Sequence, residues 1–139
     1  MPAEGSARAI ARVVLATAFF AAGVLHLVAP GGFIAITPAW VPFAREVIAI
    51  TGICEILGAL ALLVPRLRRV AGIMLALYAL SVFPANIKHA VDGVAIGGVV
   101  LGPGYHVPRL LFQPVIIWWA LWAGAVIDWP MRRQARHQS

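Results

Sequence analysis

Four long apolar runs set the tightest limit on how this sequence can fold. The runs cover residues 13–29, 47–64, 70–87 and 110–127, and each has 17 or 18 residues. Charged residues, prolines or glycines bound every run. With a flanking turn, each run reaches about 20 residues, the length at which an α-helix crosses the hydrocarbon core of a bilayer. The pattern therefore predicts four membrane-spanning helices.

The composition favours a membrane protein over a soluble domain. Hydrophobic residues make up 62% of the 139 residues and charged residues only 12%, about half the usual charged share. A soluble domain this small needs more charged surface. We predict an all-α fold: a transmembrane four-helix bundle with antiparallel, up-down helices, in which residues 1–139 form a single membrane domain. The predicted spans are about residues 9–29, 46–64, 70–89 and 108–128.

Lys and Arg residues lie at the ends of the runs and predict the orientation of the bundle. One side carries eight of them, Arg8, Arg12, Arg66, Arg68, Arg69, Arg132, Arg133 and Arg136, and the other side three, Arg45, Lys88 and Arg109. The more basic side of a membrane protein faces the cytoplasm, so we expect both termini there. The same placement argues against nucleic-acid binding, despite a net charge of +6, because the charges do not follow one face. The alternative for the first run is a signal peptide, whose removal would leave three spans.

The stretch TGICEILGALALL, residues 51–63, places a carboxylate, Glu55, inside the second run. Glu55 lies ten residues after Arg45, about 15 Å along the helix. An unpaired carboxylate at that depth costs at least a few kcal/mol, so it needs a partner. Its face of the helix carries four small residues, Thr51, Gly52, Gly58 and Ala59. Small residues let neighbouring helices approach closely, so we expect Glu55 to point into the bundle.

All four predicted helices contribute polar side chains to the half of the bundle expected to face outward. We predict a ligand-binding site formed by His26, Glu55, Asn86, Arg109 and Gln113. The long Arg109 side chain can reach inward, so we expect it to pair with Glu55. Pro84 and Pro114 would bend two helices near the same level and open space between them. The alternative is that the five side chains only hold the helices together. No catalytic residue and no metal site is assigned.

The segments AAGVLHLVAP, GICEILGALALLVP, FPANIKHA and RLLFQPVIIWW, one from each predicted helix, together carry a family pattern. The chain resembles the DoxX-like family of small four-helix membrane proteins over about residues 10–128. The five candidate residues fall at the family's polar positions. The resemblance implies an integral protein of a bacterial cytoplasmic (inner) membrane. One branch of the family forms part of a membrane thiosulfate:quinone oxidoreductase, other members are linked to redox homeostasis, and distant animal relatives resemble receptor-assembly chaperones.

Two functions follow from this resemblance. In the first, the protein is redox-associated and binds a quinone or similar small amphiphile in the outer half. Glu55 then exchanges a proton, and a membrane or periplasmic redox partner protein supplies electrons, because the chain has no evident electron carrier. In the second, the protein is a non-catalytic assembly or chaperone module within the lipid bilayer. Two further alternatives are a haem protein with His26 and His89 as ligands, and a transporter that forms a homo-oligomer to build its path.

Overall fold

The computed structural model describes residues 5–130. Six helices lie within these residues: α1 (Ser6–Val28), α2 (Gly31–Ile36), α3 (Ala44–Leu63), α4 (Arg68–Ser81), α5 (Phe83–Val91) and α6 (Pro103–Ala123). Over these residues the only β-type pairing is an isolated bridge between Ile96 and Val99. The prediction of an all-α fold is confirmed. Three of the predicted cytoplasmic arginines, Arg132, Arg133 and Arg136, lie outside the described residues.

Three helical segments of the described chain are long and apolar enough to cross a membrane: Ser6–Val28, Ala44–Leu63 and Arg68–Val91. They correspond to the first three predicted spans, and the third consists of α4 and α5 together. Helix α6 has 21 residues but is not among them. It begins at Pro103 and ends at Ala123, earlier at both ends than the predicted 108–128. Proline suits the first turn of a helix because its missing N–H would have no partner there.

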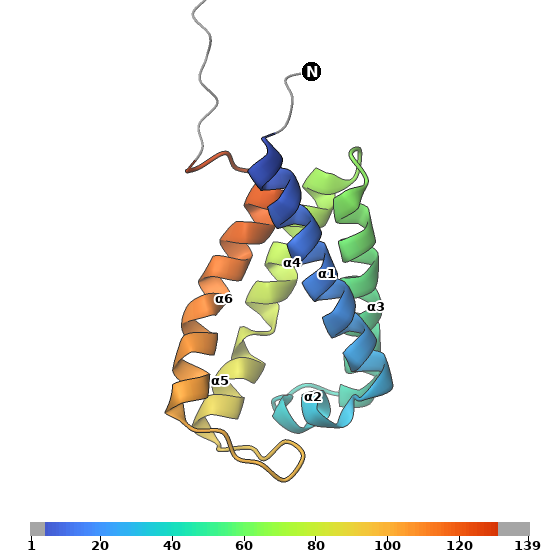
Figure 1. The fold of residues 1–139 in the computed structure, drawn as a ribbon. Coiled ribbons are helices and arrows are strands. Elements are labelled where there is room, and N and C mark those ends of the chain that lie inside the picture. The colour runs from blue at the N-terminus through green and yellow to red at the C-terminus, as the bar shows by residue number, and fades with distance from the viewer. Residues whose placement is uncertain (1–4, 131–139) are drawn as a thin grey trace, which may run out of the picture.

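The helices draw together at one end and are further apart at the other (Figure 1). Helix α1 packs on α3, and α4 packs on α6. We call the end where α1 begins and α6 ends the terminal end, and the end with α2 and residues 92–102 the loop end (Figure 1). The hydrophobic core includes Leu15, Leu62 and Leu75, all at most 3% exposed.

The surface of the described residues is unusually apolar. Large apolar side chains point outward, such as Val70 at 68% exposed and Leu111 at 70%. Beside the apolar core, eight polar or charged side chains of the described residues are buried: Arg8, Arg12, His26, Glu55, Asn86, His89, His106 and Gln113. Outward apolar faces are stable only against an apolar surrounding, so this distribution agrees with a membrane protein.

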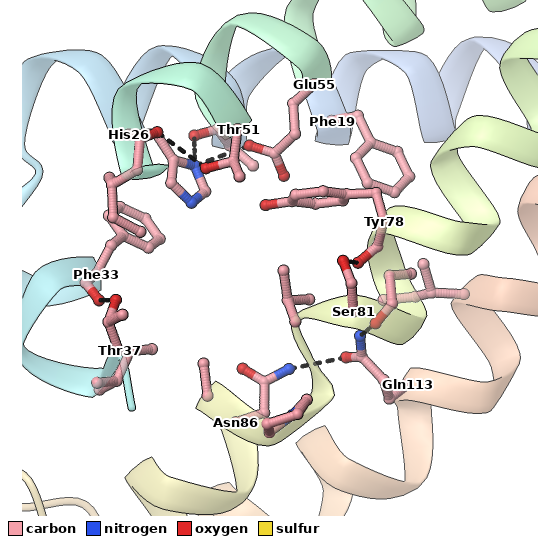
Figure 2. Close-up of a pocket in the computed structure, with 18 of the residues that line it drawn as sticks. Phe19, His26, Phe33, Thr37, Thr51, Glu55, Tyr78, Ser81, Asn86 and Gln113 are labelled. Carbon is pink, nitrogen blue, oxygen red and sulfur yellow. Dashed lines mark hydrogen bonds and ion pairs between the residues drawn. The ribbon is translucent and has the colours of Figure 1, made fainter. Parts of the chain in front are cut away.

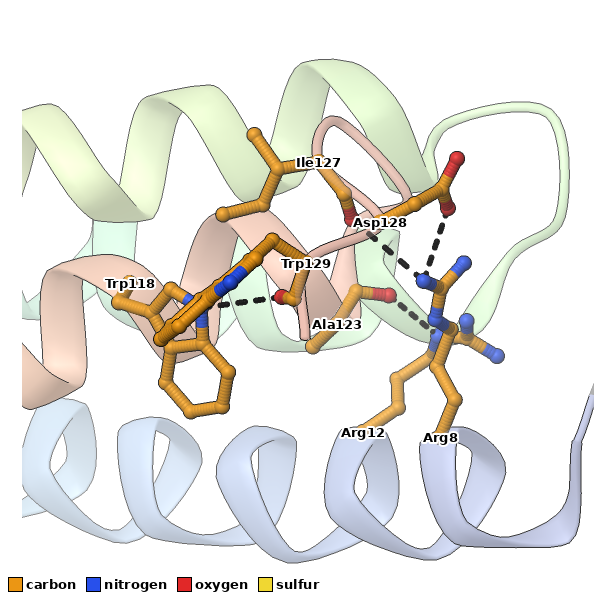
Figure 3. Close-up of polar contacts among 7 residues, drawn as sticks. All are labelled: Arg8, Arg12, Trp118, Ala123, Ile127, Asp128 and Trp129. Carbon is orange, nitrogen blue, oxygen red and sulfur yellow. Dashed lines mark hydrogen bonds and ion pairs between the residues drawn. The ribbon is translucent and has the colours of Figure 1, made fainter. Parts of the chain in front are cut away.

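Two arginines of α1 join the first helix to the last at the terminal end (Figure 3). Arg12 Nε donates to the carbonyl oxygen of Ala123 at 2.8 Å, and Arg8 forms an ion pair with Asp128 at 2.9 Å. The last carbonyl groups of a helix have no partner within the helix and carry partial negative charge, so cations stabilise them. Arg8 and Arg12, predicted as topology signals, therefore also close the bundle.

A break divides the third apolar segment where the sequence predicts a bend. Helix α4 ends at Ser81 and α5 begins at Phe83, with Pro84 in the first turn of α5. Proline cannot donate a backbone hydrogen bond, and its ring clashes with the preceding turn of a continuous helix. Helix α6, in contrast, continues through Pro108 and Pro114.

Candidate functional site

A cavity of about 660 Å³ lies between the helices and towards the loop end. Its wall is mostly apolar and includes Phe19, Phe33, Trp40, Phe112 and Trp119. All six helices contribute to it. The volume lies within the roughly 300–1,000 Å³ that is typical of small-molecule sites.

All five predicted site residues line this one cavity: His26, Glu55, Asn86, Arg109 and Gln113. They form two separate groups, and Figure 2 labels two members of each: His26 and Glu55, and Asn86 and Gln113. The first group, His26 and Glu55, lies on α1 and α3. The second, Asn86, Arg109 and Gln113, lies on α5 and α6. We call them the acidic group and the arginine group.

Two glycines bring the acidic group together. A Cβ atom added to Gly23 would lie 2.6 Å from the carbonyl oxygen of Gly52, and one added to Gly52 would lie 2.7 Å from His26 Cβ. No side chain fits at either position, so α1 and α3 are in backbone contact there. This contact places His26 Nδ1 2.8 Å from Glu55 Oε2. Both side chains are buried, at 7% and 3% exposed.

The surroundings of His26 determine which ring nitrogen carries a proton. Nδ1 lies 2.8 Å from the carbonyl oxygen of Ala22 and 2.8 Å from Glu55 Oε2. A carbonyl oxygen can only accept, so Nδ1 must carry a hydrogen. Phe33 of α2 stacks on the ring at 3.8 Å between centroids. The ring is therefore fixed, and Figure 2 shows its other nitrogen on the side of the open space.

Tyr78 and Thr51 add hydroxyl groups beside Glu55. Both line the cavity, and Figure 2 shows the Tyr78 ring extending its hydroxyl towards the Glu55 carboxylate. Phe19 meets the Tyr78 ring edge-on at 6.3 Å between centroids. Neither residue is among the five predicted site residues, and Thr51 is predicted only as a small residue on the Glu55 face. The available signal was that Tyr78 is the one polar side chain in the run VAGIMLALYAL.

The arginine group is a connected hydrogen-bond network. Arg109 Nη2 donates to Asn86 Oδ1 at 2.7 Å, and Asn86 Nδ2 donates to Gln113 Oε1 at 3.0 Å. Gln113 Nε2 in turn donates to the carbonyl oxygen of Ala79. Ala79 lies in the last turn of α4, where backbone carbonyls lack helical partners. The network therefore ties the end of α4 to α5 and α6.

The predicted pairing of Glu55 with Arg109 is wrong. Glu55 pairs with His26, whereas Arg109 binds Asn86 and His89, with Nη1 2.8 Å from His89 Nδ1. The physical reason is that the close approach of α1 and α3 gives Glu55 a partner next to it. Arg109 belongs to the other group of the cavity wall, and its nearest polar partners are on α5.

His89, which the sequence suggested as a haem ligand together with His26, lies behind Arg109. It is 1% exposed and does not line the cavity, unlike His26. Its ring contacts His106 edge-on at 4.6 Å between centroids. The two proposed haem ligands therefore do not face a common space. In the described part of the chain, no group of three or more His, Cys, Asp or Glu side chains is placed to hold a metal ion.

Comparisons with known proteins identify a family. Neither the curated proteins nor the solved structures give a match to the chain. One family model matches residues 15–124, a range that contains all five predicted site residues and both glycines of the α1–α3 contact. The chain belongs to the DUF8561 family, which is described as a domain of unknown function.

Proposed function

We propose that the chain is a redox-associated integral membrane protein whose cavity binds a quinone or a similar small amphiphile. The observation that carries this proposal is the composition of the cavity wall. A largely apolar space of about 660 Å³ has hydrogen-bonding groups on two separate sides. Such a wall suits a molecule with an apolar body and polar atoms at its edges.

A quinone has this chemistry. Its ring is flat and apolar, and its two carbonyl oxygens lie at opposite edges. Arg109 on one side of the cavity and the Tyr78 hydroxyl on the other are donors. The aromatic side chains of the wall provide stacking surfaces. His26 and Glu55 form a pair through which a proton can move when the ring is reduced, and the electrons come from a partner protein.

The proposed topology has four membrane spans, of which α6 is the fourth. Both termini lie on the cytoplasmic side. The terminal end then faces the cytoplasm, and the loop end, nearer the cavity, faces outward. The charge asymmetry of the sequence supports this orientation. The resemblance to the DoxX-like family supports the same fold and a bacterial inner-membrane location.

The second candidate is a non-catalytic assembly module in which the polar residues are structural. The hydrogen bonds from Asn86 to Gln113 and from Gln113 to Ala79 favour it, because these groups satisfy one another without a ligand. Networks of this kind hold helices together in membranes.

Mass spectrometry of small molecules retained after purification in a mild detergent separates the two candidates. The matched variants are Ala22→Phe, which fills the cavity, and Ala21→Phe, at an exposed neighbouring position that does not line it. We expect the wild type and Ala21→Phe to retain a quinone or another amphiphile, and Ala22→Phe to lose it. If all three proteins are stable and empty, the assembly function stands and the binding function fails.

A further inference from the structure

Arg109 carries a positive charge in the cavity wall, and the two hydrogen-bond partners of its side chain among residues 5–130, Asn86 and His89, are neutral. Its Nη2 binds the amide oxygen of Asn86 at 2.7 Å, and its Nη1 lies 2.8 Å from His89 Nδ1. Arginine only donates, so His89 Nδ1 must be the acceptor. A protonated imidazolium has no acceptor nitrogen, and His89 is therefore neutral. Neither partner balances the charge of Arg109.

No described carboxylate supplies the missing charge. Among residues 5–130, no Asp or Glu oxygen lies within 4.0 Å of an Arg109 nitrogen. The other charged residue of the wall, Glu55, is already engaged by His26 Nδ1 at 2.8 Å. The two sides of the cavity thus differ: Glu55 has a partner that bears a proton, whereas Arg109 has no described partner that bears a negative charge.

The surroundings of Arg109 in the cavity wall are largely apolar. In an apolar surrounding, an unbalanced charge attracts a counter-ion much more strongly than it does in water.

We propose that the molecule bound in the cavity is an anionic amphiphile. Its acidic head group pairs with Arg109, and its apolar part lies against Phe112, Ile116 and Trp119, which line the cavity. This inference rests on the proposed function and narrows it, because a neutral quinone would accept hydrogen bonds from Arg109 but leave its charge unbalanced.

A matched pair of quenchers tests the head group. 12-Bromododecanoate and 12-bromododecanol share one apolar chain and differ in charge, and bromine quenches tryptophan on contact. Trp40 and Trp119 line the cavity and act as reporters. We expect saturable quenching in lipid nanodiscs, with the acid binding roughly tenfold or more tightly than the alcohol. The double variant Trp40→Phe/Trp119→Phe identifies quenching that comes from the bulk bilayer.

Three variants assign the preference to Arg109. Arg109→Gln removes the charge and should reduce acid binding to the level of the alcohol. Arg45→Gln removes an exposed arginine that does not line the cavity, so it should leave the preference unchanged. Asn86→Asp keeps Arg109 but places a carboxylate beside its Nη2, so it should also abolish the preference. Asn86→Asp keeps the test valid even if Arg109→Gln does not fold.

The outcomes separate this inference from the proposed function. Equal saturable quenching by acid and alcohol would leave an amphiphile site but overturn the anionic head group. Absence of saturable quenching by both would overturn the proposed function as well. A preference for the acid that survives both Arg109→Gln and Asn86→Asp would also refute the role of Arg109. Competition by phosphatidic acid in the nanodisc would identify a membrane lipid as one source of the head group and support the inference.

Discussion

His26 decides how the buried carboxylate of Glu55 is held. Its Nδ1 lies 2.8 Å from Glu55 Oε2, and its ring stacks on Phe33. A fixed imidazole next to a carboxylate satisfies it without a long, flexible cation. For this reason the acid stays on the α1–α3 side of the cavity, and Arg109 remains available to the space opposite.

The pairing of His26 with Glu55 predicts strong coupling between the two residues. Replacing either one by leucine should lower the free energy of unfolding by about 3–5 kcal/mol, because the remaining partner is buried without the group that pairs with it. The double variant His26→Leu/Glu55→Leu should cost clearly less than the two single changes summed. Unfolding of the reconstituted protein by denaturant measures all four values.

The same double-mutant cycle applied to Glu55 and Arg109 is the control. These two side chains form no ion pair, so their effects should add to within about 0.5 kcal/mol. Strong coupling between Glu55 and Arg109, together with additivity between Glu55 and His26, would contradict the arrangement of the site.

Replacing Gln113 should have a second, smaller effect on the free energy of unfolding. Gln113→Leu keeps a similar volume but leaves Asn86 Nδ2 and the carbonyl oxygen of Ala79 without these partners. We expect a loss of about 1–3 kcal/mol per stranded group in the free energy of unfolding. The control is Leu111→Ala, on a 70% exposed side chain, with an expected change within about 0.5 kcal/mol. A neutral Gln113→Leu would show that water or another group replaces the amide.

The elements of the fold are held together by backbone contact where side chains are absent. At the α1–α3 contact, an added Cβ on Gly23 would meet the Gly52 carbonyl oxygen at 2.6 Å. At the α4–α6 contact, one added to Gly72 would meet the Ala120 carbonyl oxygen at 2.7 Å. Because backbone atoms cannot move away as a flexible side chain can, these contacts fix the helix spacing.

Gly23→Ala therefore tests whether helix spacing controls the site. The methyl group should force α1 away from α3, at a cost of about 1–3 kcal/mol in unfolding free energy, despite the better helix propensity of alanine. Gly31→Ala is the matched control, since nothing lies within 4 Å of its added Cβ. We also expect Gly23→Ala, but not Gly31→Ala, to weaken retention of a ligand. Equal stability of the two variants would refute the close-contact argument.

Several elements could be predicted from the sequence because a local physical signal marks them. Apolar runs bounded by charge gave three of the described helical segments, and Pro84 gave the break between α4 and α5. The short helix α2 was not predicted, because GGFIAI has only six residues and two glycines. Helix α6 starts earlier than its apolar run, since Pro103 can occupy the first turn.

The residues of the candidate site could be predicted from the sequence, but the contacts among them could not. Polar residues inside apolar runs must turn inward, so Glu55 and Gln113 could be assigned to the interior from sequence alone. The partner of Glu55 could not, because it depends on which helices are neighbours in space. The contact of His89 with Arg109 could not be predicted either, since a histidine near a helix end has many accessible roles.

At the scale of the whole molecule, the proposed orientation can be tested by labelling. In a Cys54→Ala background, which removes the single cysteine, we place a cysteine at Leu67 or at Ala95. Both positions are exposed, one between α3 and α4 and the other in the loop-end segment. We expect Leu67→Cys to react with a membrane-impermeant reagent only from the cytoplasmic side, and Ala95→Cys only from outside. Reaction of Leu67→Cys from outside in intact cells would reverse the topology.

The contacts of Arg8 and Arg12 with the end of α6 can form only late in the synthesis of the chain. Helix α1 leaves the ribosome before α6, so the Ala123 carbonyl and the Asp128 carboxylate that its arginines bind are made only after α1 is complete. In the proposed orientation, both arginines lie on the cytoplasmic side during that time, where basic residues oppose translocation. In that orientation, the same two charges first hold α1 in place and later join it to α6. A ribosome stalled before residue 123 would hold a chain whose α1 has not yet met this neighbour.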